Sequence, residues 1–284
     1  MTDFLSSLPG IATLVFSVSS MLSIGFSYTV RQVIDPLRDV PLVAGALVAN
    51  FVLVPLLSYS IMEFMALGEA RGAGLFLVAV AAGAPFVIKL VQAADRDIAL
   101  TSGLLVLLLV ATIVLMPVVV PLALPDAHVS PIAIARPLVL TMLLPLVTGL
   151  ALNALVPARA ARLRPYLSTI STVALVALLV STVLADFGDL LEVFGTGAFL
   201  AALLFVAGAF ASGYLVRLTD RDTRNELGLV TAQRNIAAAT VVATQDFGDP
   251  DTLVMVVVTL VVTMIILFPF VRVLRRRGER GARP

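Results

Sequence analysis

The chain has 284 residues and a formal net charge of +1, with 60% hydrophobic and 13% charged residues, and its mean hydropathy is +1.08. A soluble domain of this size cannot bury so much apolar surface, so most of the chain must lie in lipid and a soluble enzyme is excluded. The absence of cysteine, the single histidine (His128) and the balanced charge argue against a thiolate or histidine metal site and against a nucleic-acid partner.

Apolar runs close to the length that crosses a bilayer as a helix, about 20 residues, recur along the whole chain. The runs are continuous and rich in Leu, Val and Ala, which favours helices over the alternating strands of a barrel. We therefore predict an all-α polytopic membrane protein, a single unit over residues 1–284. The nine predicted transmembrane helices are residues 8–30, 40–62, 72–94, 97–121, 134–155, 166–185, 193–216, 226–245 and 252–273.

Arginine and lysine residues predict the orientation, because cationic loops stay in the cytoplasm. Fifteen of the 19 Lys and Arg residues fall on one side of the nine-span arrangement, many of them in the basic tail at 274–284, and only Arg71 and Arg136 fall on the other. We expect a multi-pass protein of the cell membrane, with the N-terminus outside and the C-terminus and tail in the cytoplasm. The two remaining cations, Lys89 and Arg234, lie within spans.

The span at 72–94 contains signals that interrupt a helix. Gly83 and Pro85 lie near its centre, where proline removes a backbone donor and frees a carbonyl of the preceding turn. Lys89 follows one turn later, with Gln92 beyond it. A charge inside the membrane favours a functional site, although the long stem of Lys89 also allows its ammonium to reach the inner surface.

The span at 226–245 carries three consecutive polar side chains at its centre, Gln233, Arg234 and Asn235, between Thr231 and Thr240. The three cannot all face lipid. Arg234 must line a cavity or bind backbone carbonyls, which favours a functional site; a purely structural polar clamp between helices is the alternative.

The spans at 72–94 and 226–245 occupy corresponding places in the two parts of the chain. Each carries a cation and is followed by an acidic turn and another apolar span, and the predicted orientation makes them run in opposite directions. This pattern is typical of secondary transporters, in which inverted repeats bring broken helices together at the midplane. We predict an inverted repeat of four plus five helices with two interrupted crossing helices.

Several short motifs follow one another along the chain: Leu22–Thr29 (LSIGFSYT), Asn50–Pro55 (NFVLVP), Asp97–Ser102 (DIALTS) with Pro117, Leu143–Gly149 (LLPLVTG), and Gln233 in the second interrupted span. In this order and spacing they resemble the bile acid:sodium symporter family over nearly the whole chain. The resemblance implies a fold with the first of ten helices absent. It also implies a panel of spans 8–30, 134–155 and 166–185 and a core of spans 40–62, 72–94, 97–121, 193–216, 226–245 and 252–273.

The chain departs from the sodium-coupled members it resembles. Those members carry Ser and Asn after the first break, Ser and Thr on the next helix, and Glu four residues before the Gln of the second crossing helix. Alignment on Asp97–Leu100 puts these residues at those positions: Val87, Ile88, Thr101, Leu105 and Leu229. Only Thr101 and Gln233 keep an oxygen ligand, whereas sodium needs several. These departures weaken the expectation of sodium coupling and leave a sodium ion and a proton as the alternative coupling ions, with Lys89, Thr101 and Gln233 as candidate ion-coupling residues.

We hypothesise that the Lys89 ammonium occupies the space that sodium fills in relatives, with Arg234 as a second fixed charge. Glu226 lies near the inner end of its span, so no carboxylate is expected to neutralise the pair, and two unpaired cations favour a small anionic substrate. Burial disfavours the charged form of lysine, which would permit coupling to a proton. The candidate substrate-binding residues are Lys89, Gln92, Thr231, Gln233, Arg234, Asn235 and Thr240.

The sequence thus predicts a secondary active transporter that carries a small organic anion by alternating access, with no catalytic residues and no cofactor beyond a coupling ion. A metalloid (arsenite-type) efflux permease is an alternative, but those permeases depend on a cysteine that this chain lacks. A membrane channel or receptor is the alternative from another class. A channel would need a continuous polar stripe or a selectivity loop, and a receptor would need a soluble domain.

Overall fold

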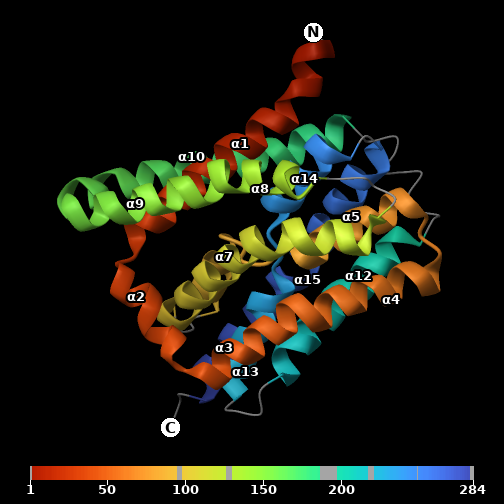
Figure 1. Cartoon of the computed structure of the whole chain (residues 1–284). Coiled ribbons are helices and arrows are strands. Elements are labelled where there is room, and N and C mark those ends of the chain that lie inside the picture. The colour runs from red at the N-terminus through yellow and green to blue at the C-terminus, as the bar shows by residue number, and fades with distance from the viewer. Residues whose placement is uncertain are drawn as a thin grey trace.

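The computed structural model describes residues 2–94, 98–125, 130–185, 197–216, 221–247 and 249–281, and every regular element in these ranges is a helix (Figure 1). His128, the first residues of the predicted spans 97–121 and 193–216, and the end of the basic tail lie outside the described residues. The helices are α1 (Thr2–Ser27), α2 (Val30–Ile34), α3 (Val40–Val48), α4 (Val54–Met65), α5 (Glu69–Val80), α6 (Val87–Ala93), α7 (Ile98–Ala123), α8 (Pro131–Leu138), α9 (Leu144–Leu155), α10 (Pro157–Ala185), α12 (Ala198–Leu215), α13 (Arg221–Ala232), α14 (Ile236–Asp246) and α15 (Pro250–Gly281), with a 3-10 turn at Asp35–Arg38 and π-helical segments at Ala49–Leu53 and Val139–Leu143.

Six helical stretches in the described part of the chain are long and apolar enough to cross a membrane. Two of them join neighbouring helices through a π-helical segment, α3 with α4 and α8 with α9. All six coincide with predicted spans. They are Gly10–Ser27, Val40–Met65, Leu100–Ala123, Pro131–Leu155, Ala198–Leu215 and Pro250–Arg275.

The other three predicted spans have a different appearance. The span at 166–185 is the second part of α10, which begins at Pro157. The span at 72–94 is divided into α5 and α6, and the span at 226–245 into α13 and α14. The two predicted interruptions are therefore confirmed, whereas the count of nine transmembrane helices and the inverted repeat stay predictions.

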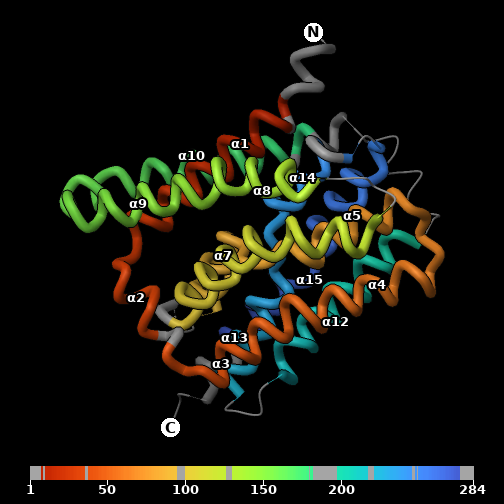
Figure 2. Tube along the Cα trace, viewed as in Figure 1, coloured from red at the N-terminus to blue at the C-terminus, as the bar shows by residue number. Residues whose placement is uncertain are grey.

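The helices pack in two groups (Figure 1). In one group α1, α9 and α10 contact one another; in the other α5 contacts α4 and α15, and α12 contacts α4, α13 and α15. A Cβ on Gly25 of α1 would lie 2.7 Å from the Cα of Gly149 in α9, so this close helix crossing requires both glycines. The chain passes from α13, which lies in the second group, to α14 (Figure 2), and α14 contacts both α1 of the first group and α5 of the second.

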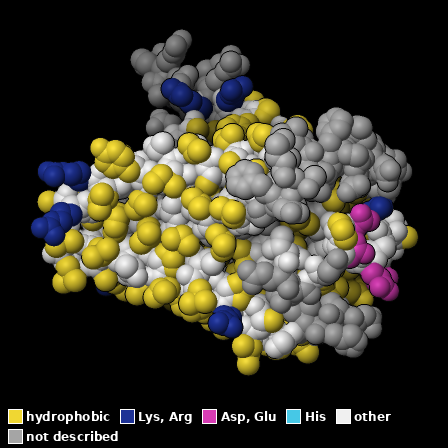
Figure 3. Space-filling model, turned by 90° about the horizontal axis from the view of Figure 1, so that it is seen from above, with side chains coloured by type: hydrophobic (Ala, Val, Ile, Leu, Met, Phe, Trp, Pro, Cys, Tyr) yellow, Lys and Arg dark blue, Asp and Glu magenta, His cyan; other side chains and the backbone are white. Residues whose placement is uncertain are grey.

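The outer surface is apolar along the length of the helices. Figure 3 shows a broad hydrophobic face with Lys and Arg side chains at its left-hand end, where α9 meets α10, and Asp and Glu side chains at its right-hand end. Large apolar side chains such as Val173 and Val176 of α10 and Leu56 and Phe64 of α4 are exposed. An apolar belt between charged ends is the surface that a lipid bilayer requires.

Candidate functional site

The first interruption, residues 81–86, is held by a hydroxyl from another helix. Thr112 of α7 accepts a hydrogen bond from the amide of Ala82 at 2.9 Å and donates one to the carbonyl of the same residue at 3.1 Å. Gly83 follows with a φ of +75°, and a Cβ there would lie 2.4 Å from the backbone nitrogen of Leu109. The break therefore requires glycine at this position, and the freed backbone groups of Ala82 have their partners in Thr112.

The second interruption, residues 233–235, lies directly against the first. The amide of Asn235 donates to the carbonyl of Ala81 at 2.8 Å, and its side chain donates to the carbonyl of Gly83 at 3.2 Å. The side-chain oxygen of Asn235 also accepts from the amide of Ala238 at 3.1 Å and so caps α14. One asparagine thus begins a half-helix and joins the two interruptions.

Arg234 is 1% exposed, and its guanidinium binds oxygens from three segments. It donates to the carbonyls of Val78, at 3.2 Å, and Ala79 in the last turn of α5. It also donates to the Thr231 carbonyl in the last turn of α13, at 3.2 Å, and to the side-chain oxygen of Asn50, at 2.5 Å. Its bonding partners are therefore neutral oxygens, most of them at the carbonyl ends of half-helices.

Asn50 reaches Arg234 from the π-helical segment Ala49–Leu53. The nitrogen of Pro55 has no hydrogen to donate to the preceding turn, and a local π turn accommodates its ring; such turns are frequent at functional sites. The amide of Asn50 donates to the carbonyl of Ala46 at 2.9 Å and to the hydroxyl of Thr231 at 3.2 Å. Both ends of its side chain are therefore engaged, which fixes the oxygen toward Arg234.

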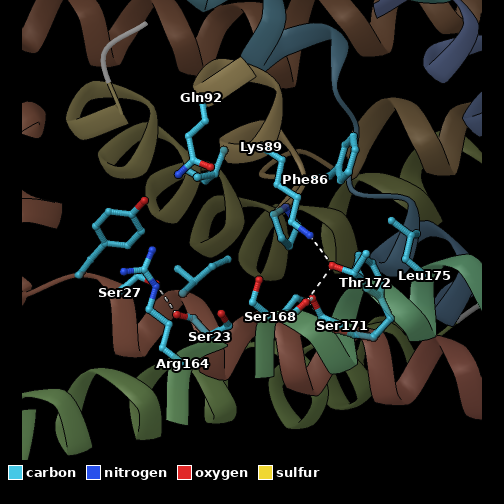
Figure 4. Close-up of a pocket in the computed structure, with 16 residues that line it drawn as sticks. Ser23, Ser27, Phe86, Lys89, Gln92, Arg164, Ser168, Ser171, Thr172 and Leu175 are labelled. Carbon is cyan, nitrogen blue, oxygen red and sulfur yellow. Dashed lines mark hydrogen bonds between the residues drawn. The ribbon is translucent and has the colours of Figure 1, made fainter. Parts of the chain in front are cut away.

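Two cavities in the described part of the chain lie near the interruptions. The larger of the two lies between α1, α6 and α10 and has a volume of about 100 Å³. Lys89 of α6 points toward α10, where its ammonium donates to the hydroxyl of Thr172 at 2.5 Å (Figure 4). Arg164 lies at the opposite side of the cavity from Lys89, near Ser23 and Ser27 (Figure 4). The lining residues include two cations and no Asp or Glu. They are Phe16, Ser20, Ser23, Ile24, Ser27, Tyr28, Pro85, Phe86, Ile88, Lys89, Gln92, Arg164, Ser168, Ser171, Thr172 and Leu175.

A smaller cavity of about 20 Å³ adjoins the interruptions. Its polar lining consists of Gln233, Arg234 and Asn235. The side-chain oxygen of Gln233 is buried and has no hydrogen-bond partner in the described part of the chain. By volume the cavity accommodates about one water molecule, whose O–H would satisfy that oxygen.

The seven predicted substrate-binding residues do not share one cavity. Lys89 and Gln92 line the larger cavity, while Gln233, Arg234 and Asn235 line the smaller one. Lys89 and Arg234, predicted to act as a pair, therefore line different cavities, although these share four wall residues: Phe16, Pro85, Phe86 and Leu175.

The remaining predicted residues lie outside both cavities. Thr231 and Thr240 are buried in α13 and α14, and neither lines one of the two cavities. Thr101, a candidate for ion coupling, donates its hydroxyl hydrogen to the carboxylate of Glu226, and both residues are buried. This contact joins α7 to α13.

Sequence reasoning missed Arg164 and most of the hydroxyl groups of the larger cavity. Arg164 is one of the fifteen cations on the predicted cytoplasmic side, and its sequence position alone indicates no further role. A signal was present in the spacing of Ser20, Ser23 and Ser27, which puts three hydroxyls on one face of α1. Ser168, Ser171 and Thr172 show the same helical spacing on α10.

These features define a class of protein: a helical membrane protein with two broken helices that meet at a buried cation. Secondary transporters are typically built around such a meeting of broken helices. Residues 14–192 match the sodium bile acid symporter family, and the chain belongs to that family. The family takes its name from symporters, which are membrane transporters and not enzymes. The matched segment includes α5 and α6 but ends before α13 and α14.

Two plant proteins are among the relatives. The chain is 25% identical over 236 residues to a probable sodium/metabolite cotransporter of Arabidopsis thaliana, BASS3, chloroplastic, with 81% of this chain and 54% of the relative covered. It is 23% identical over 288 residues to another from the same organism, BASS5, chloroplastic, with 95% of this chain and 68% of the relative covered. The chain thus spans about half the length of the first relative.

Proposed function

We propose that this protein is a secondary active transporter that carries a small organic anion across the cell membrane by alternating access. The observation that carries the proposal is the larger cavity, whose lining holds Lys89 and Arg164 and no carboxylate side chain. With an effective dielectric constant of about 20 near a protein surface, the Coulomb attraction between two unit charges 4 Å apart is about 4 kcal/mol before the cost of desolvation is subtracted. A site with two cations therefore favours an anion over a neutral molecule of the same size.

The hydroxyl groups of the cavity complement the two cations. Ser20, Ser23 and Ser27 of α1 and Ser168 and Thr172 of α10 also line it. Three of these hydroxyls, those of Ser20, Ser27 and Thr172, donate to carbonyls of their own helices, and a hydroxyl that rotates donates to an anionic oxygen instead. The volume of about 100 Å³ suits a compact anion with few heavy atoms. Aromatic and aliphatic side chains, Phe16, Phe86 and Leu175, would enclose its apolar part.

The position of the cavity fits alternating access. It lies between α1 and α10 on one side and α6, which continues the interrupted span, on the other. We assign α1, α8, α9 and α10 to the panel and the other helices to the core. A movement of the core against the panel would separate Lys89 from Thr172 and change the side from which the cavity is reached. The excess of arginine at one face supports a cytoplasmic C-terminus.

The test begins with a search for the anion. Purified protein is heated in the presence of short monocarboxylates, dicarboxylates and sulfonates, because a ligand that binds only the folded state raises the melting temperature. Any stabilising anion is then offered to proteoliposomes under separate sodium and proton gradients. This second step identifies the coupling ion, for which we propose either a proton or a sodium ion.

Three variants decide whether the cavity is the binding site. Lys89→Gln and Arg164→Gln each remove one charged donor, and we expect about tenfold to hundredfold weaker anion binding. Arg162→Gln removes an exposed cation from the same helix that does not line the cavity, and its affinity should match the wild type. Equal affinities in all four proteins, or uptake of neutral solutes only, would refute the proposal.

A further inference from the structure

The carbonyl ends of two half-helices meet at one buried side chain. α5 ends at Val80 and α13 ends at Ala232, and carbonyls in the last turn of each accept hydrogen bonds from Arg234. The C-terminal end of a helix carries about half an elementary negative charge. The two ends together therefore present about one negative charge, which the guanidinium balances.

The oxygens that would coordinate a free cation at this crossing already accept hydrogen bonds from Arg234. Unwound carbonyls and the C-terminal ends of half-helices are the groups that coordinate a coupling ion in transporters with broken helices. Here the carbonyls of Val78, Ala79 and Thr231 and the side-chain oxygen of Asn50 all accept from Arg234. Sodium needs several oxygen ligands in place of its water. The oxygens at the crossing are already bound to the guanidinium, so they do not fit a sodium ion beside it.

Apolar side chains add to this disagreement. Val87, Leu105 and Leu229 stand where the sodium-coupled proteins that the chain resembles carry oxygen ligands, and all three are buried. Among the candidate ligands, Thr101 is bound to Glu226. Gln233 lines the same small cavity as the cationic Arg234.

We propose that the guanidinium of Arg234 is a tethered cation that takes the place of a free coupling ion at the helix crossing, so that the protein binds no sodium there. The sequence hypothesis gave this place to Lys89. The ammonium of Lys89, however, donates to Thr172 of α10, whereas Arg234 holds the carbonyls of both interrupted helices. The inference rests on the proposed transport function and narrows its coupling by excluding a sodium ion at the helix crossing, and its test needs no transported substrate.

The test is the thermal unfolding of purified Arg234→Ala protein in different salts. Removal of the guanidinium leaves carbonyls without a donor and opens space between them. Sodium or guanidinium ions at millimolar concentration should therefore raise the melting temperature of the variant, relative to choline at the same ionic strength. The wild type should show no such difference. Arg164→Ala, which removes an arginine from the larger cavity, should behave as the wild type does.

Equal responses of Arg234→Ala and the wild type to sodium and guanidinium would overturn the proposal. If Arg234→Ala does not fold in any salt, Arg234→Lys and Arg234→Met decide. The proposal requires the charged variant to be clearly more stable than the neutral one, and an equal loss in both would contradict it. Failure of anion uptake would remove the transport proposal but leave these salt responses unchanged, so the two failures are distinguishable.

Discussion

The side-chain oxygen of Asn50 accepts a hydrogen bond from the guanidinium of Arg234, 184 residues later in the chain. Asn50 is 0% exposed and Arg234 is 1% exposed. In the described part of the chain, Asn50 is the one partner that accepts from the guanidinium through a side chain rather than through the backbone. It connects the π-helical segment between α3 and α4 to the crossing of the interrupted helices.

Asn50→Ala should destabilise the protein by about 1.5–3 kcal/mol, because a buried charge loses a hydrogen-bond partner. Thermal or denaturant unfolding of the purified protein measures this loss. Asn153→Ala is the matched control, since Asn153 donates to the neutral carbonyl of Tyr28 at 3.0 Å and its loss should cost only about 0.5–1.5 kcal/mol. A larger loss in the control would show that Arg234 does not depend on Asn50.

Thr112→Val tests the hydroxyl that holds the first interruption. The substitution keeps the shape of the side chain but leaves the amide and the carbonyl of Ala82 without the hydroxyl of Thr112. Each buried backbone group without a partner costs about 1–3 kcal/mol, so the melting temperature should fall clearly. Thr259→Val is the control, because Thr259 is equally buried and its hydroxyl donates only within its own helix, to Met255. Similar melting temperatures in the two variants would contradict this role of Thr112.

Gly83→Ala should be among the most damaging substitutions in the described part of the chain. Alanine is strained at a φ of +75°, and its Cβ would meet the backbone of Leu109. Together these effects should cost more than about 2 kcal/mol. Gly10→Ala is the contrasting variant, because nothing lies within 4 Å of the added Cβ and alanine favours a helix. Its unfolding curve should match or exceed that of the wild type, and equal losses in both variants would refute the claim.

Ser168→Cys tests access to the larger cavity, and the natural absence of cysteine makes the experiment clean. Ser168 lines the cavity, whereas the neighbouring Thr169 is exposed on α10 and does not. A charged thiol reagent should modify the Ser168→Cys protein faster than the Thr169→Cys protein in proteoliposomes, and a bound anion should slow that reaction. Mass spectrometry of the intact protein measures the rates. Equal rates with no protection by any stabilising anion would show that the cavity is not the access path.

The interruptions were predictable because their causes are local. Gly83 and Pro85 break a helix through their own backbone properties, and three consecutive polar side chains at Gln233–Asn235 cannot continue an apolar span. Both breaks are present at the expected places. Gly25 and Gly149 each lie in one of the quoted motifs, but their close approach exists only where α1 and α9 pack together.

The sequence by itself determined that this protein spans a lipid membrane, that it is helical, and where two of its helices break. These features depend on the length of apolar runs and on the backbone properties of single residues, which act within a few positions of the chain. Only the tertiary structure decided which charges lie together. Lys89 shares its cavity with Arg164 and binds Thr172, 83 residues away, while Arg234 binds the ends of two half-helices. Such partnerships depend on how distant helices pack, and helical periodicity within one segment carries no information about its neighbour.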